Sequence, residues 1–124
     1  MPRDTKQRRA IRRVFLDAAR PLTPEEVVEE GQRFASTLGI ATVYRNVKRL
    51  AEDGWLTPVE LPGAPVRYEL ADRPHHHHFV CTTCEQAFDV HGCPPEVESL
   101  APSGFTVESH DVVLYGTCAA CSPE

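Results

Sequence analysis

The chain has 124 residues, of which 41% are hydrophobic and 25% charged, so it can form one domain or two very small ones. No apolar run approaches the roughly 18 residues that a membrane span needs, and the first residues lack the apolar core of a signal peptide. We therefore expect a cytoplasmic protein with reduced thiols and no membrane partner.

The formal net charge of −5 is divided unevenly along the chain. All 13 lysines and arginines lie at or before Arg73, and 11 acidic residues share that stretch, so residues 1–73 sum to +2. The remaining residues have seven acidic side chains and no basic one, which gives −7. A basic first half indicates a polyanionic partner, and an acidic second half indicates bound cations.

Two helices are predicted at the start of the chain. Residues 5–19 place apolar side chains at helical spacing, with arginines on the other side, and the helix ends before Pro21. The next helix begins after Thr23. Pro24 suits its first position, and Glu26 completes a capping box with the threonine.

A third helix is predicted from about Ile40 to Asp53, and Gly54 ends it. Its core-facing stripe is Ile40, Val43, Val47 and Leu50. The side chains outside that stripe suit contacts with DNA, and they are Thr42, Tyr44, Arg45, Asn46, Lys48 and Arg49. Arginine and asparagine pair bidentately with guanine and adenine, whereas tyrosine, threonine and lysine suit phosphates and thymine methyl groups.

Residues 55–61 and 66–70 predict two short strands around a tight turn. Three helices followed by a hairpin are typical of a winged helix-turn-helix, whose third helix enters the major groove. The alternative is a generic helical bundle with a solvated basic face, but the hairpin and the charge division favour DNA binding. We expect bases to be contacted by Tyr44 and Arg45, and phosphates by Lys48, Arg49, Arg8 and Arg9.

Four cysteines form two Cys-x-x-Cys pairs, Cys81/Cys84 and Cys118/Cys121. Each pair can chelate one ion, and two pairs provide the tetrahedral sulfur site that zinc prefers. Two disulfides or a thioredoxin-type redox pair are the alternatives. No amphipathic helix follows either pair, which counts against the redox motif, and a reducing cytoplasm disfavours disulfides. The spacing therefore favours a structural zinc.

Four consecutive histidines, residues 75–78, run directly into a strand-like segment. Side chains of a strand alternate between its faces, so His75 and His77 should point one way and His76 and His78 the other. One stretch can therefore serve two metal sites, unless the histidines form a surface cluster with no ligand role. The residues that could complete such sites are Glu69, Asp89, His91, Glu96 and His110.

Four segments carry a specific resemblance in chain order: ATVYRNVKRL (41–50), RYEL (67–70), HHHHFVCTTC (75–84) and LYGTCAAC (114–121). Together they resemble the ferric uptake regulator family over nearly the whole chain. The resemblance implies an α+β fold, with a winged-helix DNA-binding domain at 1–71 and a small α/β dimerisation domain with structural zinc at 74–124. It also implies a metal-sensing repressor, not an enzyme, that acts as a homodimer on a double-stranded operator, which we expect to be an inverted repeat.

Carried over by position, the resemblance implies three metal sites. A structural zinc is assigned to Cys81, Cys84, Cys118 and Cys121. A regulatory metal is assigned to His75, His77, Glu96 and His110. A second metal, at the hinge between the domains, is assigned to Glu69, His76 and His78, with Asp89 as an addition. The chain departs from the family in having no histidine before His75, and Cys93 is expected to be a small buried residue rather than a fourth ligand.

Metal is expected to stabilise the arrangement in which two recognition helices lie one DNA turn apart. The expected regulatory ion is Zn²⁺ or Fe²⁺, with Mn²⁺ or Ni²⁺ behind them. One alternative is an iron-based peroxide sensor of the same family. A zinc metalloenzyme is a weaker alternative because the sequence contains neither His-Glu-x-x-His nor a nucleophile elbow. A metal buffer that does not bind DNA is the third.

Overall fold

The computed structural model describes residues 5–123. The chain divides into two compact units, the first ending at Asp72 and the second beginning at Arg73. The predicted domain ranges, 1–71 and 74–124, lie on the two sides of this division, and residues 1–4 and 124 of those ranges lie outside the described part. Separate DNA-binding and metal-binding roles for the two units stay predictions.

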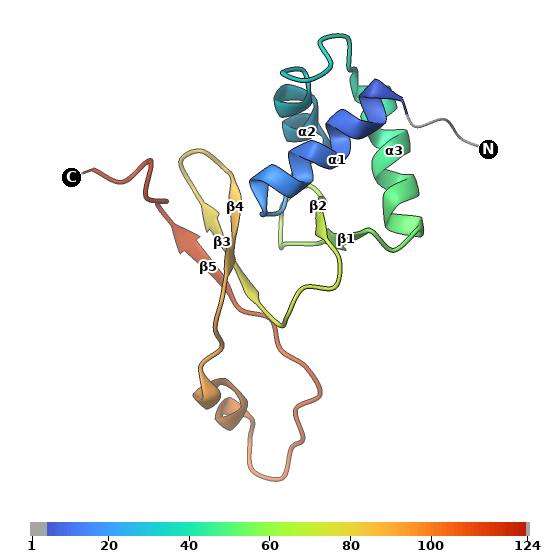
Figure 1. Ribbon diagram of the computed structural model, residues 1–124. Helices are drawn as coiled ribbons and strands as arrows, with labels where there is room; N and C mark the ends of the chain where they lie inside the picture. The colour runs from blue at the N-terminus through green and yellow to red at the C-terminus, as the bar shows by residue number, and fades with distance from the viewer. Residues whose placement is uncertain (1–4, 124) are drawn as a thin grey trace. The chain divides into compact units, whose positions relative to one another are not determined.

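The first unit contains three helices followed by a two-stranded antiparallel sheet (Figure 1). Its elements are α1 (Lys6–Ala18), α2 (Pro24–Gly31), α3 (Ile40–Glu52), β1 (Leu56–Val59) and β2 (Arg67–Leu70). Leu56 lies opposite Leu70, and Val59 lies opposite Arg67, so the turn of the hairpin lies between these two strands. This order confirms the predicted three helices and hairpin of a winged helix-turn-helix.

Local chemistry fixes the helix boundaries. The Thr23 hydroxyl accepts the Glu26 N–H at 3.1 Å, and the Glu26 carboxylate accepts the Thr23 N–H at 2.9 Å, which is the predicted capping box. Gly54 follows α3 with a φ of 82°, a left-handed conformation that glycine adopts without strain. These side chains and this glycine therefore set where α2 begins and where α3 ends.

The residues between α1 and α2 extend the hairpin in a way that the sequence did not indicate. The Leu22 N–H donates to the Tyr68 carbonyl at 2.9 Å, and the Tyr68 N–H donates to the Leu22 carbonyl at 2.8 Å. This short antiparallel bridge satisfies backbone groups on both segments. The start of α2 is thereby tied to β2.

The helices enclose an apolar core that also receives side chains from connecting segments and from β1. Its buried members are Ala10, Ile11, Val14, Phe15, Leu22, Val27, Ala35, Leu38, Val43, Val47 and Leu56. Of the stripe predicted on α3, Val43 and Val47 are buried and Leu50 is half-buried, but Ile40 is 42% exposed. The prediction for Ile40 is wrong because α3 begins at this residue, and Leu38 just before the helix enters the core instead.

The second unit is a three-stranded sheet in the order β4–β3–β5 (Figure 1). Its elements are β3 (His77–Cys81), β4 (Ala87–Val90), the 3₁₀-helix η1 (Pro95–Leu100) and β5 (Val113–Gly116). The central strand β3 is antiparallel to β4 and parallel to β5. Parallel pairing requires a long connection, which here runs from β4 to β5 and contains η1.

This second unit has very little apolar core of its own. Within residues 73–123, only His77, Cys81 and Ala87 are buried. Large apolar side chains are instead exposed, namely Leu100, Phe105, Leu114 and Tyr115. A unit of this size with so small a core requires additional stabilisation, for which metal ions and a partner surface are the usual sources.

Candidate metal centres and nucleic-acid interface

Four cysteine sulfurs converge beside the end of β3. Their sulfur atoms all lie within 4.8 Å of one another, and the sulfurs of Cys84 and Cys118 are 3.9 Å apart. Sulfurs on a tetrahedral zinc lie about 3.8 Å apart when the Zn–S distance is about 2.3 Å. The two Cys-x-x-Cys pairs therefore come together at a spacing that suits one zinc ion.

The protonation chemistry of these thiols also indicates a cation. The Cys81 sulfur accepts the N–H groups of Cys84 and Cys118, both at 3.4 Å, and these hydrogen bonds lower the pKa of the Cys81 thiol to about 6. The neighbouring Cys118 thiol raises the pKa of Cys121 to about 12. One thiolate thus forms readily, whereas all four cannot lose their protons at neutral pH without a cation between them.

A second cluster forms on one face of β3. The Nε2 atom of His75 lies 3.1 Å from that of His77 and 3.3 Å from that of His110. Imidazole nitrogens on a tetrahedral zinc lie about 3.3 Å apart when the Zn–N distance is about 2.0 Å. Burial lowers the pKa of His77, which favours the neutral imidazole that a metal binds. These three histidines fit a single metal ion.

The fourth member of this cluster is Cys93, not Glu96. The Cys93 sulfur lies 2.8 Å from Nε2 of His110, and Cys93 is half-buried. Gly92 has a φ of 126°, which permits the turn that directs the chain away from β4 just before Cys93. Glu96 falls in the first turn of η1, where it is exposed and outside the cluster. In the structure Cys93 therefore lies beside these histidines where Glu96 was expected, and a ligand role for either residue stays a prediction.

A third cluster lies on the opposite face of β3, as the alternation of the histidines predicts. His78 pairs with Asp89 across β3 and β4. The Asp89 Oδ1 atom lies 3.6 Å from Nε2 of His76 and 3.8 Å from Nε2 of His78. The other carboxylate oxygen, Oδ2, accepts a hydrogen bond from Arg73 at 2.7 Å. Glu69, the remaining predicted ligand, belongs to β2 of the first unit, and its part in this cluster stays a prediction.

The predicted DNA-contacting side chains of α3 divide into two groups. Tyr44, Arg45, Lys48 and Arg49 are exposed, whereas Thr42 and Asn46 are half-buried. The Asn46 amide donates to the Thr42 carbonyl at 2.8 Å, and Arg45 donates to the Thr42 hydroxyl at 3.2 Å. Both Arg45 and Asn46 thus bond within their own helix, and which of these side chains contact DNA stays a prediction.

Tyr44 is held by α2. Its hydroxyl donates to the Glu25 carboxylate at 3.2 Å, and the Glu25 charge raises the pKa of the Tyr44 phenol. The phenol therefore stays neutral at physiological pH, and half of the residue's surface is exposed. This arrangement leaves the ring available to a thymine methyl group, while the hydroxyl is directed toward the protein.

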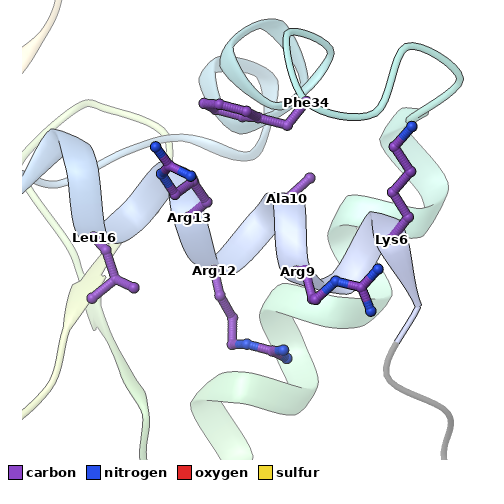
Figure 2. A pocket seen from close by; sticks show the side chains of 7 residues that line it. All are labelled: Lys6, Arg9, Ala10, Arg12, Arg13, Leu16 and Phe34. Carbon is purple, nitrogen blue, oxygen red and sulfur yellow. The ribbon is translucent and has the colours of Figure 1, made fainter.

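A basic groove of about 420 Å³ follows α1 (Figure 2). Its lining residues are Lys6, Arg9, Ala10, Arg12, Arg13, Leu16 and Phe34. The Arg13 guanidinium lies 5.0 Å from the centre of the Phe34 ring and pairs with Asp17 at 3.0 Å. Arg9 was predicted as a phosphate contact and lines this groove, whereas the other predicted arginine, Arg8, is half-buried and does not.

The sequence reasoning missed several residues of these sites. Lys6 and Arg13 were missed although they recur with the predicted Arg9 at helical i, i+3, i+7 spacing, and this period could have located the groove. Arg73 is the last basic residue before the acidic half, which was a signal for a role there. Cys93 was considered as a fourth ligand and set aside in favour of a buried residue, because its approach to His110 depends on the path of a long irregular connection.

The family model of the ferric uptake regulator family matches residues 2–115. The chain belongs to this family. The ferric uptake regulation protein of Campylobacter jejuni is 32% identical over 125 residues, which cover 95% of this chain and 78% of that protein. The peroxide operon regulator of Bacillus subtilis is 30% identical over 124 residues, which cover 97% of this chain and 84% of that protein. A solved zinc-bound manganese uptake regulator aligns with a TM-score of 0.80 and 28% identity, covering 94% of this chain and 91% of that one.

Membership of the ferric uptake regulator family makes the chain a metal-responsive transcriptional regulator with an α+β fold. The resemblance inferred from the four sequence segments is confirmed. Within residues 5–123, none of the helices is both long and apolar enough to cross a bilayer.

Proposed function

We propose that the chain is a metal-dependent repressor that acts as a homodimer on an inverted-repeat operator, and that zinc is the metal that it senses. The observation that carries the choice of zinc is the donor set His75, His77, Cys93 and His110. A thiolate with three imidazoles suits zinc, which is borderline-soft, better than Mn²⁺ or Fe²⁺, for which carboxylates are the more usual partners. Iron is the second choice.

The cysteine cluster has a different role in this proposal. Cys81, Cys84, Cys118 and Cys121 supply four sulfurs and leave no open coordination position, which is the pattern of a structural zinc. Structural zinc binding contributes about 10–16 kcal/mol in small modules, which is comparable to the whole stability of a domain. Since the second unit has almost no apolar core, this ion would determine whether the unit folds.

The sensing cluster takes its side chains from two separate segments of the second unit, and this suggests how metal binding would be coupled to dimer formation. His75 and His77 precede or begin β3, whereas Cys93 and His110 lie at the two ends of the connection between β4 and β5. Binding all four side chains to one ion would hold both ends of this connection against the sheet. The connection carries Leu100 and Phe105, which are 82% and 70% exposed.

We assign the homodimer interface to these apolar side chains together with Leu114 and Tyr115 of β5. Exposed apolar surface of this kind typically marks a protein interface, and a twofold dimer presents the same surface from each copy. A metal that orders this surface would favour the dimer in which two α3 helices lie one DNA turn apart. To shift the ratio of DNA-competent to DNA-incompetent protein from 1:99 to 99:1, the metal must favour the DNA-competent state by about 5.5 kcal/mol.

DNA recognition is assigned to the first unit. Arg45 and Tyr44 would contact bases, and Lys48 and Arg49 would contact phosphates, with the basic groove of α1 as a further phosphate contact. Arg45→Ala should flatten the preference for operator over random DNA. Arg49→Ala should weaken binding to operator and to random DNA alike. It should also reduce the slope of log affinity against log salt concentration by about one. An unchanged operator preference in Arg45→Ala would show that α3 is not the reading helix.

One experiment tests the proposal as a whole. The purified protein is analysed for metal content before and after mild chelation, and operator binding is measured by fluorescence anisotropy in both states. We expect one zinc per chain to survive chelation, the exchangeable ion to be lost, and operator binding to return with Zn²⁺ at lower concentration than with Fe²⁺ or Mn²⁺. Operator binding that persists after complete loss of the exchangeable ion would overturn the proposal.

Peroxide sensing is the second candidate. The similarity to the Bacillus subtilis peroxide operon regulator and the cluster of His76, His78 and Asp89 both favour it. An iron ion at imidazoles and a carboxylate would make those histidines targets of metal-catalysed oxidation. Mass spectrometry after peroxide treatment of the iron-loaded protein would show oxidised His76 or His78 if this reading holds.

We further propose that the protein has no enzymatic activity and works in the cytoplasm. The sequence contains neither His-Glu-x-x-His nor a nucleophile elbow. A cytoplasmic location accords with five cysteines that are all free thiols in the structure.

A further inference from the structure

In the third cluster, formed by His76, His78 and Asp89, the carboxylate that would bind a metal already forms an ion pair. One nitrogen of the Arg73 guanidinium lies 2.7 Å from Oδ2 of Asp89, so the carboxylate already has a cationic partner. The Asp89 side chain is 3% exposed and the Arg73 side chain 21%, and solvent therefore screens the pair weakly. A close charge-assisted hydrogen bond of this kind is a strong one.

The position of this arginine in the chain makes the pair unusual. Residues 74–124 contain no lysine or arginine, so Arg73 is the single permanently charged cation of the second unit. The unit also contains Glu85, Glu96, Glu98, Glu108 and Asp111, yet the guanidinium pairs with Asp89. The carboxylate with the arginine is thus the one that faces two imidazoles.

We infer that Arg73 is a tethered cation that opposes divalent metal at the cluster of His76, His78 and Asp89, so that this cluster fills only after the cluster at Cys93. The inference rests on the proposed function in one respect, namely that both clusters are metal sites. It states the order in which the two clusters bind metal, and it names Arg73, which is a ligand of neither cluster, as the cause of that order.

Charge accounts for that order. A divalent ion at Oδ1 of Asp89 would lie on the same carboxylate as the Arg73 guanidinium, and like charges only a few ångströms apart repel in a weakly screened site. The hydrogen bond from the guanidinium also occupies Oδ2 of Asp89, so a metal would have to bind through Oδ1 alone or displace the arginine. The second unit has no other lysine or arginine that could oppose a metal at the cluster of His75, His77, Cys93 and His110, and its one guanidinium is paired with Asp89. The same ion should therefore bind more tightly at the cluster that contains Cys93 than at the cluster of His76, His78 and Asp89.

The test uses two substitutions that separate charge from hydrogen bonding. Arg73→Gln removes the charge but keeps N–H donors, and Arg73→Lys keeps the charge on a different donor. Co²⁺ is titrated into protein that retains zinc at the four cysteines. Binding at Cys93 is followed by its sulfur-to-metal charge-transfer absorption, and binding at the histidine–aspartate cluster by calorimetry after the first site is full.

In the wild-type protein, the sulfur-linked site should fill first and the second site later. Arg73→Gln should tighten the second site by on the order of tenfold or more and leave the first unchanged, whereas Arg73→Lys should stay near wild type. Weaker second-site binding in Arg73→Gln would mean that the arginine positions Asp89 for the metal, and unchanged binding would mean that it has no effect. Either result overturns the inference.

A measurement on the unaltered protein keeps the test open if a variant fails to fold. In ¹⁵N-arginine-labelled protein, the Arg73 side-chain N–H signal should remain protected while the first site fills and lose protection when the second fills. A signal that stays protected throughout would show that the metal does not displace the guanidinium from Asp89, which would overturn the inference. Operator binding is not a readout in either experiment, so failure of the repressor proposal and failure of this inference are separate results.

Discussion

The sharpest prediction concerns which side chain completes the sensing site. Cys93→Ser should weaken the exchangeable zinc, whereas Glu96→Gln should leave it nearly unchanged. The Cys93 sulfur lies 2.8 Å from the His110 ring nitrogen, and Glu96 is exposed in η1 outside the cluster. Serine keeps the size of the side chain but replaces a thiolate by a neutral hydroxyl, which is a poor zinc ligand.

The magnitude follows from the number of ligands. Loss of a group that only supports a ligand costs about 10–100-fold in metal affinity, so loss of one of four direct ligands should cost at least about 100-fold, or about 2.7 kcal/mol. The measurement is a competition titration against a zinc indicator in protein that retains the ion at the four cysteines. Cys93→Asp serves as a third variant, since a carboxylate should restore part of the affinity and shift the preference toward Mn²⁺ or Fe²⁺.

The opposite pattern would refute the reasoning. If Glu96→Gln loses the exchangeable zinc and Cys93→Ser keeps it, the ligand set implied by the family resemblance is the right one, and the contact between Cys93 and His110 has no role in metal binding. The argument for zinc over iron would then lose its basis.

Three further predictions concern folding and protonation. Cys81→Ser should unfold the second unit or leave a monomer, and a folded dimer with unchanged zinc content would exclude the structural role. Thr23→Ala removes the capping box with Glu26 and should lower the free energy of unfolding by about 1 kcal/mol in urea titrations, with Thr23→Ser close to wild type. Burial holds the pKa of His77 below 6.5, so its contribution to stability should be complete above that pH and fall as the pH drops below it, which NMR titration of the chelated protein and urea unfolding at two pH values would check.

Local patterns predicted the order of the elements and several helix ends in the first unit. The capping box at Thr23 and the glycine after α3 depend on neighbouring residues alone, and the structure has both. The exposure of Ile40 could not be inferred this way, because apolar periodicity does not say which turn of a helix first reaches the core. Leu38 takes that position from the preceding loop, where no periodic pattern exists.

In the metal clusters, too, local patterns predict some of the neighbouring residues and not others. Strand alternation separates His75 and His77 from His76 and His78, and the structure has these two pairs on different clusters. The exchange of Glu96 for Cys93 depends on where an irregular connection turns, and neither spacing nor composition contains that information. Family position therefore pointed to Glu96, whereas the structure has Cys93 beside His110.

The register of β3 links the three clusters. Cys81 ends this strand, and its neighbour across the sheet is Gly116 of β5, two residues before Cys118. A zinc held by Cys81 and Cys118 would therefore fix the alignment of β3 with β5 from one end. A slip of one residue would exchange the faces of the histidines, placing His76 and His78 toward His110 and His77 toward Asp89. In the proposed arrangement, loss of the structural zinc should thus abolish both exchangeable sites together rather than merely lower stability, so metal titration of a Cys118→Ser variant that remains folded should show no exchangeable zinc.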